Sequence, residues 1–219
     1  MGFFIVDEPQ RSEAWFLARL GRVTASEAKD MLSSVKSGEA AGRRNLRVRK
    51  VVERLTGKPQ EEGYTSPAME RGQELEPDAL AAYEARTGNL ASAVGFLAHH
   101  DLMAGGSPDG VIGDFEGLVE LKCPNSATHW GYLRGNLGCP PEHLAQLTHL
   151  LWLTGCQWID FLSFDPRFPK DLQTFYCRVH RESVDIEGYA KTLKTFLDEV
   201  DREVAAAKGW SILAEEKVS

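Results

Sequence analysis

Two acidic residues and one lysine have types and a spacing that could do chemistry together. Asp109 lies in a Ser-Pro-Asp-Gly segment that favours a turn, and Glu120 and Lys122 follow in an apolar run. Side chains two apart on a strand point to the same face, so Glu120 and Lys122 should project together while Val119 and Leu121 enter the core. The glycines between the two segments predict a hairpin that brings Asp109 beside Glu120.

A carboxylate pair with a lysine beside it is suited to hold a divalent metal ion against a phosphodiester. Two carboxylates close together repel each other, whereas a hard cation such as Mg²⁺ prefers oxygen ligands and removes the conflict. A bound metal polarises the phosphoryl oxygen and lowers the pKa of a coordinated water, and a second ion can stabilise the leaving oxygen. The alternative is a surface hairpin with solvated side chains. The Ser-Pro-Asp-Gly turn and the apolar flanks favour the metal site.

Several blocks of the sequence resemble, in the same order, the landmarks of a nuclease family. These blocks are residues 17–26, 71–79, 107–110, 120–124, 144–146 and 164–167. The chain resembles the nucleases with a Pro-Asp…Glu-x-Lys core, and within them the exonuclease of phage lambda and its viral recombination relatives. The resemblance implies an α/β (α+β) fold with a restriction-endonuclease-like core, in which helices flank a central mixed sheet.

The resemblance implies a ligand set for the metal. Glu76 matches a helix-borne carboxylate of the family, so we expect it to complete the site with Asp109, Glu120 and the Leu121 carbonyl. These groups would hold Mg²⁺ or Mn²⁺, as two ions. The alternative for Glu76 is a solvated acid on a helix surface.

Two further residues are implied to act at this site. Lys122 would orient and activate the attacking water, and Gln146 resembles a helical Gln of the family that orients phosphate or water. The alternative for Gln146 is a buried amide that ties a helix to the sheet. We interpret His143 and His149, on the same helix, as structural.

The resemblance also implies a pocket for a terminal 5′-phosphate, made by Arg19, Ser26 and Ser107. Arg offers a fork of donors to phosphate, and the two serines add hydroxyl contacts. The chain departs from lambda where Thr128 replaces an Arg, which puts the strength of this recognition in doubt. An acid that lambda carries upstream of Ser-Pro-Asp-Gly is displaced as well, and no role is assigned to His99, His100 or Asp101.

Local patterns predict the elements that must position these residues. Helices are predicted over residues 12–20, 24–32, 45–57, 67–86, 141–153 and from 185 onward, and strands over 158–164 and 174–180. Thr24 and Glu27 fit a capping box, Asn45 can cap the third helix, and Gly155 can end the helix that starts at Pro141.

A basic segment follows the second predicted helix. Residues 43–58 hold seven basic residues against one acid, Glu53, a local charge of +6. We expect DNA contacts from Arg43, Arg44, Arg47, Lys50 and Arg54. Acids gather instead in the C-terminal part, so a polarised surface could steer DNA to one side. The alternative is an ordinary solvated helix face.

Composition is that of one compact enzyme. The 219 residues are 42% hydrophobic and no composition shift divides them, so we expect a single nuclease domain over residues 1–219. No apolar run is long enough to span a membrane and no signal peptide is evident, so a cytoplasmic location is expected. Four cysteines without Cys-x-x-Cys spacing indicate free thiols. The net charge of −7 argues against a simple DNA-binding protein.

The resemblance, together with the features of the site, implies a 5′→3′ exonuclease on double-stranded DNA with free 5′ ends. It would release 5′-mononucleotides and leave 3′ single strands for phage-type homologous recombination. By analogy with lambda we expect a ring-shaped homotrimer and a single-strand annealing protein as its partner. The alternatives are a structure-specific or restriction-like endonuclease with the same metal core, and a DNA-binding clamp without catalysis.

Overall fold

The computed structural model describes residues 2–10, 12–60, 67–135 and 138–216. Its α-helices are α1 (Glu13–Arg19), α2 (Ala28–Met31), α3 (Ala41–Thr56), α4 (Pro67–Thr87), α5 (Ser126–Arg134), α6 (Pro141–Thr154) and α7 (Ile186–Glu216). Its strands are β1 (Phe3–Val6), β2 (Val23–Thr24), β3 (Ala91–Ser92), β4 (Phe96–His99), β5 (Ala104–Gly106), β6 (Gly110–Ile112), β7 (Gly117–Lys122), β8 (Trp158–Phe164) and β9 (Thr174–His180). Three short 3-10 helices are η1 (Ala25–Glu27), η2 (Lys170–Leu172) and η3 (Arg181–Ser183).

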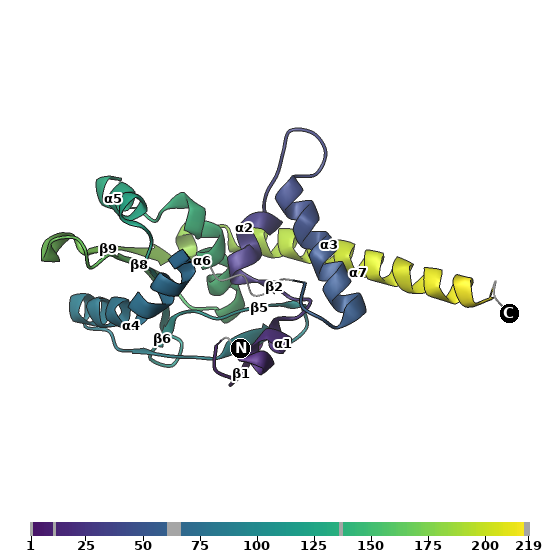
Figure 1. Cartoon of the computed structure of the whole chain (residues 1–219), viewed down its shortest axis with the longest axis horizontal. Coiled ribbons are helices and arrows are strands. Elements are labelled where there is room, and N and C mark those ends of the chain that lie inside the picture. The colour runs from purple at the N-terminus through teal and green to yellow at the C-terminus, as the bar shows by residue number, and fades with distance from the viewer. Residues whose placement is uncertain (1, 11, 61–66, 136–137, 217–219) are drawn as a thin grey trace.

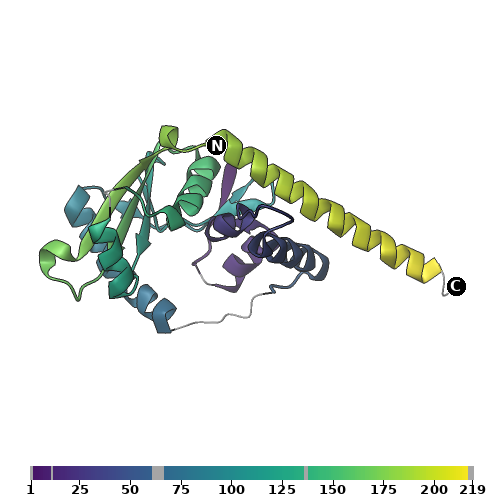
Figure 2. The same cartoon turned by 90° about the horizontal axis from the view of Figure 1, so that it is seen from above.

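The larger sheet is mixed, as predicted, with strand order β3-β6-β7-β8-β9. Strands β7 and β8 are parallel, and the other pairs are antiparallel. Alternate residues of β7 face opposite layers. Val119 and Leu121 pack with Tyr83 of α4, whereas Leu118 packs with Leu147 of α6. The sheet therefore lies between α4 and α6 (Figure 2).

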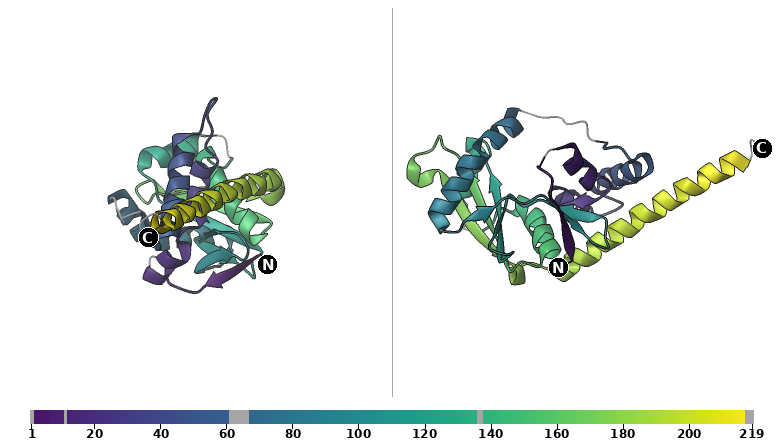
Figure 3. Two further views of the ribbon diagram at one scale, coloured as in Figure 1. Left: turned by 90° about the vertical axis from the view of Figure 1, so that its right-hand side faces the viewer. Right: turned by 90° about the horizontal axis from the view of Figure 1, so that it is seen from below.

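A second sheet, which the sequence analysis did not predict, has the order β1-β4-β5-β2. Helix α6 lies between the two sheets and packs against both β5 and β8 (Figure 3). The segment 107–109 connects β5 of this sheet directly to β6 of the larger one. The residues expected to do chemistry therefore lie where the chain crosses from one sheet to the other.

Helices α3 and α7 pack against each other and cover the second sheet (Figure 1). Their buried cluster joins Leu46 of α3 to Leu193, Phe196 and Val200 of α7, together with Val23 of β2. The last turns of α7 extend beyond the rest of the described chain (Figure 1). Within the described ranges, none of the helices combines the length and the apolar composition needed to cross a membrane.

Candidate active site

The hairpin of β6 and β7 places Asp109 beside Glu120, as predicted. Gly110 pairs with Val119 in the antiparallel register, so the residue before Gly110 lies next to Glu120. The backbone N–H of Leu121 donates to Asp109 Oδ2 at 2.6 Å and fixes this carboxylate. Gly110 is required here, because a Cβ atom would lie 2.8 Å from Val119 and 2.9 Å from Ala91.

The Glu120 carboxylate is buried, and its two oxygens differ. Lys122 and Gln146 both donate to Oε1, Gln146 at 2.5 Å. Oε2 is buried without a hydrogen-bond partner in the described structure. A buried carboxylate oxygen that lacks a partner is costly unless a cation fills the place. One oxygen of Glu120 is therefore bound by the protein, and the other has no hydrogen-bond partner in the described structure.

Charges around Asp109 favour a cation. Burial is the main cause that raises the pKa of Asp109 to about 8, and repulsion from Glu120 and Glu76 adds to it. Burial alone would lower the pKa of Lys122, but the negative charges of Glu120 and Asp109 outweigh it, and the pKa of Lys122 lies above its ordinary value. Lys122 is therefore charged, whereas the raised pKa of Asp109 means that a second carboxylate charge beside Glu120 is unfavourable unless a cation compensates it.

A pocket of about 370 Å³ adjoins these groups. Glu76 of α4 lines it together with Asp109, Leu121 and Lys122. Within the described residues, no group of three His, Cys, Asp or Glu side chains is arranged to hold a metal ion alone. Mg²⁺ commonly binds through one or two carboxylates, waters and substrate phosphates, so the donors present fit such an ion. The observation that supports this fit is the Glu120 Oε2 atom, which is buried without a hydrogen-bond partner in the described structure.

Three residues of this region were missed or misjudged from sequence. His143 lines the pocket rather than being only structural, and Tyr132 and Cys123 line it too. The Tyr132 hydroxyl lies 3.0 Å from His143 Nε2, and burial lowers the pKa of His143 to about 4. The sequence could have indicated that His143 faces the site, since it lies three residues before Gln146 and therefore on the same face of the helix. His149, in contrast, lies in the core with its Nδ1 2.6 Å from the Tyr189 hydroxyl.

Arg71 and Asp165, each in one of the blocks that resemble the nuclease family, support the loop after β7. Arg71 donates to the Pro124 carbonyl at 3.2 Å. Asp165 is buried and accepts from Ser126 at 2.7 Å and from Arg167 at 2.8 Å. Burial opposes the shift, but the hydrogen bonds from Arg167 and Ser126 lower the pKa of Asp165. These contacts tie α4, the loop after β7 and the end of β8 together.

The predicted phosphate-binding residues lie in one region, next to the second sheet. The Arg19 guanidinium lies 4.1 Å from the centre of the Trp15 ring, and Trp15 Nε1 donates to Ser107 Oγ at 3.1 Å. Ser26 is exposed in η1, with its hydroxyl 3.3 Å from that of Thr24. Thr24 pairs with Gly105 across β2 and β5, which brings the chain around Ser26 close to the chain that leads to Ser107.

The positions at which the sequence departs from the lambda pattern have local roles. The Thr128 N–H bonds to Asn125 Oδ1 at 2.9 Å at the start of α5. His99 Nδ1 accepts from the backbone N–H groups of Asp101 and Leu102, each at 3.1 Å. The His99 ring also stacks on Trp152. We therefore interpret His99 as a residue that fixes the turn between β4 and β5.

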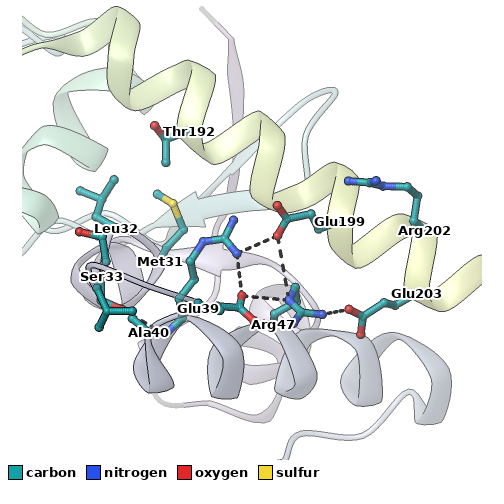
Figure 4. Close-up of a pocket in the computed structure, with 14 residues that line it drawn as sticks. Met31, Leu32, Ser33, Glu39, Ala40, Arg47, Thr192, Glu199, Arg202 and Glu203 are labelled. Carbon is teal, nitrogen blue, oxygen red and sulfur yellow. Dashed lines mark hydrogen bonds and ion pairs between the residues drawn. The ribbon is translucent and has the colours of Figure 1, made fainter.

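The expected separation of basic and acidic surfaces is wrong, because the basic face of α3 packs against the acidic face of α7. Arg47 pairs with Glu39 at 2.7 Å and with Glu203 (Figure 4). Arg43 lies between Glu39 at 2.7 Å and Glu199 at 2.8 Å. The spacing that suggested a DNA-binding stripe is the spacing of one helix face, and here that face packs against a neighbouring helix.

Of the other three predicted DNA contacts, Lys50 and Arg54 make ion pairs and Arg44 makes none in the described structure. Lys50 is buried and pairs with Glu27 at 2.8 Å and Glu53 at 3.0 Å. Arg54 pairs with Asp201 at 2.5 Å. Of the five predicted contacts, only Arg44 is exposed and makes no ion pair within the part of the chain that the structure describes. The positive charge that α3 can offer to DNA is therefore smaller than its sequence indicates.

Comparisons with known proteins agree with this architecture. Residues 14–157 match the model of the YqaJ-like viral recombinase domain. The crystal structure of an alkaline exonuclease from Laribacter hongkongensis is similar, with a TM-score of 0.83 and 38% identity over 93% of this chain and 100% of that chain. The same exonuclease in complex with dAMP matches equally well. A phage-related exonuclease from Haemophilus somnus 129PT shares the fold, with a TM-score of 0.65 and 14% identity over 85% of this chain and 96% of that chain. No curated protein matches the sequence.

Proposed function

Because the chain belongs to the family of YqaJ-like viral recombinase domains, we propose that it uses a divalent metal to digest double-stranded DNA from 5′ ends. It is a nuclease of the alkaline exonuclease type that acts in recombination. The observation that carries the proposed metal chemistry is the Asp109–Glu120 pair, in which a buried Glu120 oxygen has no hydrogen-bond partner in the described structure. Lys122, beside this pair, supplies one fixed positive charge.

Asp109, Glu120, the Leu121 carbonyl and Glu76 are the groups proposed to hold Mg²⁺ or Mn²⁺, as two ions. When bound, the metal polarises the phosphoryl oxygen and lowers the pKa of a coordinated water. Lys122 orients that water and offsets the negative charge that develops on the phosphate. Gln146 holds Glu120 by its hydrogen bond to Oε1, so that Oε2 remains for the ion.

Arg19, Ser26 and Ser107 are proposed to bind the terminal 5′-phosphate. The Arg19 guanidinium rests on Trp15 and makes no ion pair with a carboxylate in the described chain, so its donors can meet an anion. Ser107 lies only two residues before Asp109. A terminal phosphate held at Ser107 would leave the next phosphodiester near the carboxylate pair, which favours release of 5′-mononucleotides and a 3′ single strand.

The larger assembly is proposed from the family resemblance. We infer a homotrimeric ring that encloses the DNA, and a single-strand annealing protein as the partner that receives the 3′ strand. Residues 1–219 are proposed to form one nuclease domain, a view supported by β8 and β9, which extend the sheet beyond residue 157. Its proposed place of action is the cytoplasm.

Digestion of linear and closed circular duplexes tests this function. A linear duplex labelled at the 5′ end should release labelled mononucleotide first, only when Mg²⁺ or Mn²⁺ is present, and the closed circle should stay intact. Cleavage of the circle would favour an endonuclease with the same metal core. If neither substrate is degraded with either metal, a DNA-binding clamp would be the better account.

A further inference from the structure

Gly72 lies in the interior of helix α4, where a glycine is unfavourable. Glycine destabilises a helix relative to alanine, because its backbone loses more conformational freedom on folding. Gly72 does not adopt a positive φ, so its conformation suits any residue. Among the described residues, a Cβ atom on Gly72 would have no packing neighbour within 4 Å. Neither backbone conformation nor packing in the described chain therefore explains this glycine.

The space beside Gly72 is the pocket of the candidate active site. Gly72 lines this pocket of about 370 Å³ together with Asp109 and Lys122. Glu76, four residues further along α4, lines it as well. Residues four apart project from the same face of a helix, so a side chain at position 72 would project toward the pocket as Glu76 does. The missing side chain therefore keeps room free next to the carboxylates.

Helix α4 is held in place on this side of the pocket. The Arg71 guanidinium, next to Gly72, donates to the Pro124 carbonyl at 3.2 Å, and Pro124 also lines the pocket. Further along the helix, the buried Tyr83 donates its hydroxyl to Asp160 of β8 at 2.8 Å. Because both contacts fix α4, a side chain at position 72 would narrow the pocket rather than displace the helix.

Another wall of the pocket is fixed as well. Tyr132 of α5 and His143 of α6 line it, and the Tyr132 hydroxyl lies 3.0 Å from His143 Nε2. The same hydroxyl donates to Glu142 Oε1 at 3.0 Å. The His143 ring lies on Phe161 of the sheet, with 4.8 Å between the ring centres. The pocket therefore cannot widen easily to compensate for a side chain on α4.

The chemistry proposed for this pocket requires free space along its walls. A phosphodiester inside a DNA strand carries a sugar on each side, so the strand must run past Asp109 and Glu120 rather than end there. Glycine allows a ligand to approach a backbone closely, because no Cβ atom stands between them. Gly72, on the same helix face as Glu76, is placed to allow such an approach.

We propose that Gly72 lets the sugar–phosphate backbone of the cut strand come into van der Waals contact with α4, and thereby sets how closely the scissile phosphodiester approaches Asp109 and Glu120. This inference rests on the proposed exonuclease function and adds a residue that contacts the substrate. A methyl group at position 72 would hold the strand back by about 1 Å, and a misplacement of that size can reduce a rate about 100-fold.

Gly72→Ala tests this role, because stability and activity should change in opposite directions. Alanine favours the helix, so the Tm should rise by about 2 °C. On a linear duplex with 5′-phosphate ends and Mg²⁺, kcat/KM should fall at least about tenfold. Gly72→Leu, which also favours a helix but is larger, should lower kcat/KM further.

Gly131→Ala is the matched control. Gly131 also lies in a helix with open space around it, but it is not among the residues that line the pocket. Its Tm should rise in the same way, and its kcat/KM should stay unchanged. Wild-type kcat/KM in Gly72→Ala would overturn the proposal. A lower Tm in Gly72→Ala would overturn it too, because the glycine would then serve the fold.

Binding of the same duplex with Ca²⁺, which also takes oxygen ligands, separates this inference from the exonuclease function. The Kd should be several-fold higher in Gly72→Ala than in wild type and in Gly131→Ala. If wild type digests no duplex but this difference appears, the close approach at Gly72 stands and the exonuclease proposal falls. If wild type digests the duplex and the Kd is equal in all three proteins, the role of Gly72 is refuted.

Discussion

At the scale of one residue, the Glu120 carboxylate is the group that best supports the proposed cation site. Its Oε1 accepts from Lys122 and Gln146, whereas its Oε2 is buried without a hydrogen-bond partner in the described structure. The spacing of Asp109, Glu120 and Lys122 predicted their association, because strand periodicity and a hairpin are local properties. The approach of Gln146 from α6 depends on packing, and only the family resemblance indicated it.

Asp109→Asn should separate metal binding from stability. Asn keeps the shape of Asp, can still accept the N–H of Leu121 and removes the buried acid whose pKa is raised, so the free energy of unfolding without metal should rise at neutral pH. The rate of DNA hydrolysis should fall at least about 100-fold, because a carboxylate ligand is lost. Asp114→Asn, in the exposed turn of the same hairpin, should change neither quantity. Full activity in Asp109→Asn would remove Asp109 from the site.

His149 should make the protein sensitive to acid. Burial lowers its pKa to about 4 in the folded state, whereas the unfolded chain has the ordinary value of 6.5. Between these values the unfolded state binds more protons, so stability falls as the pH drops from about 6.5 to about 4. His149→Gln, which can still bond to Tyr189, should flatten this dependence of urea unfolding on pH. An equal slope in wild type and variant would show that other groups cause the acid sensitivity.

At the scale of elements, capping residues and long periodic segments were predictable and short strands were not. The bounds of β8 and β9 match their predicted ranges, α6 ends one residue later than predicted, and Gly155 ends it in the left-handed conformation as expected. Strands β1, β4 and β5 carry too few residues for an alternating pattern. Gly105 in β5 is needed because a side chain there would overlap Phe96, which is a tertiary reason that no local pattern reveals.

Two predictions for helix α3 were wrong, namely its first residue and the exposure of its basic face to solvent. It begins at Ala41 rather than after Asn45, and no side chain caps it. Its basic face meets acids of α7, such as Glu199 and Glu203, which lie about 150 residues further along the chain. Such pairing depends on the fold, so the sequence indicated a DNA-binding stripe where the structure has an interface between helices.

Gly117→Ala should destabilise the larger sheet. A Cβ atom on Gly117 would overlap the Trp158 ring, and Arg178 lies 3.6 Å from the centre of that ring on one face. We expect a loss of about 1–3 kcal/mol in the free energy of unfolding. Gly131→Ala, in α5 with open space around it, should instead gain about 0.5–1 kcal/mol. Urea unfolding of both variants checks this, and equal stability of Gly117→Ala and wild type would contradict the close packing.

The ion pairs of α3 should limit its contribution to DNA binding. Without divalent metal, Arg44→Ala should reduce the slope of log affinity against log salt by about 0.9, the value for one phosphate contact. Arg47→Ala should leave the slope unchanged, because Glu39 and Glu203 already neutralise Arg47. A reduced slope in Arg47→Ala would mean that DNA displaces these carboxylates.

At the scale of the whole molecule, the two candidate sites belong to different sheets and are joined by one short connection. The segment 107–109 leaves β5 with Ser107, at the proposed phosphate pocket, and reaches β6 with Asp109, at the carboxylate pair. Helix α6 packs against both sheets and carries Gln146 and His143. The spacing between the proposed phosphate pocket and the carboxylate pair is therefore fixed by the fold itself, as the proposed release of 5′-mononucleotides requires.

Soaking crystals of the protein in Mn²⁺ and recording the anomalous signal tests the central claim most directly. Our account predicts an anomalous peak for an ion that contacts both Asp109 and Glu120. Glu120 should contribute its Oε2 atom, which has no hydrogen-bond partner in the described structure. A map with no ion between these two carboxylates, or with the ion held elsewhere, would contradict it.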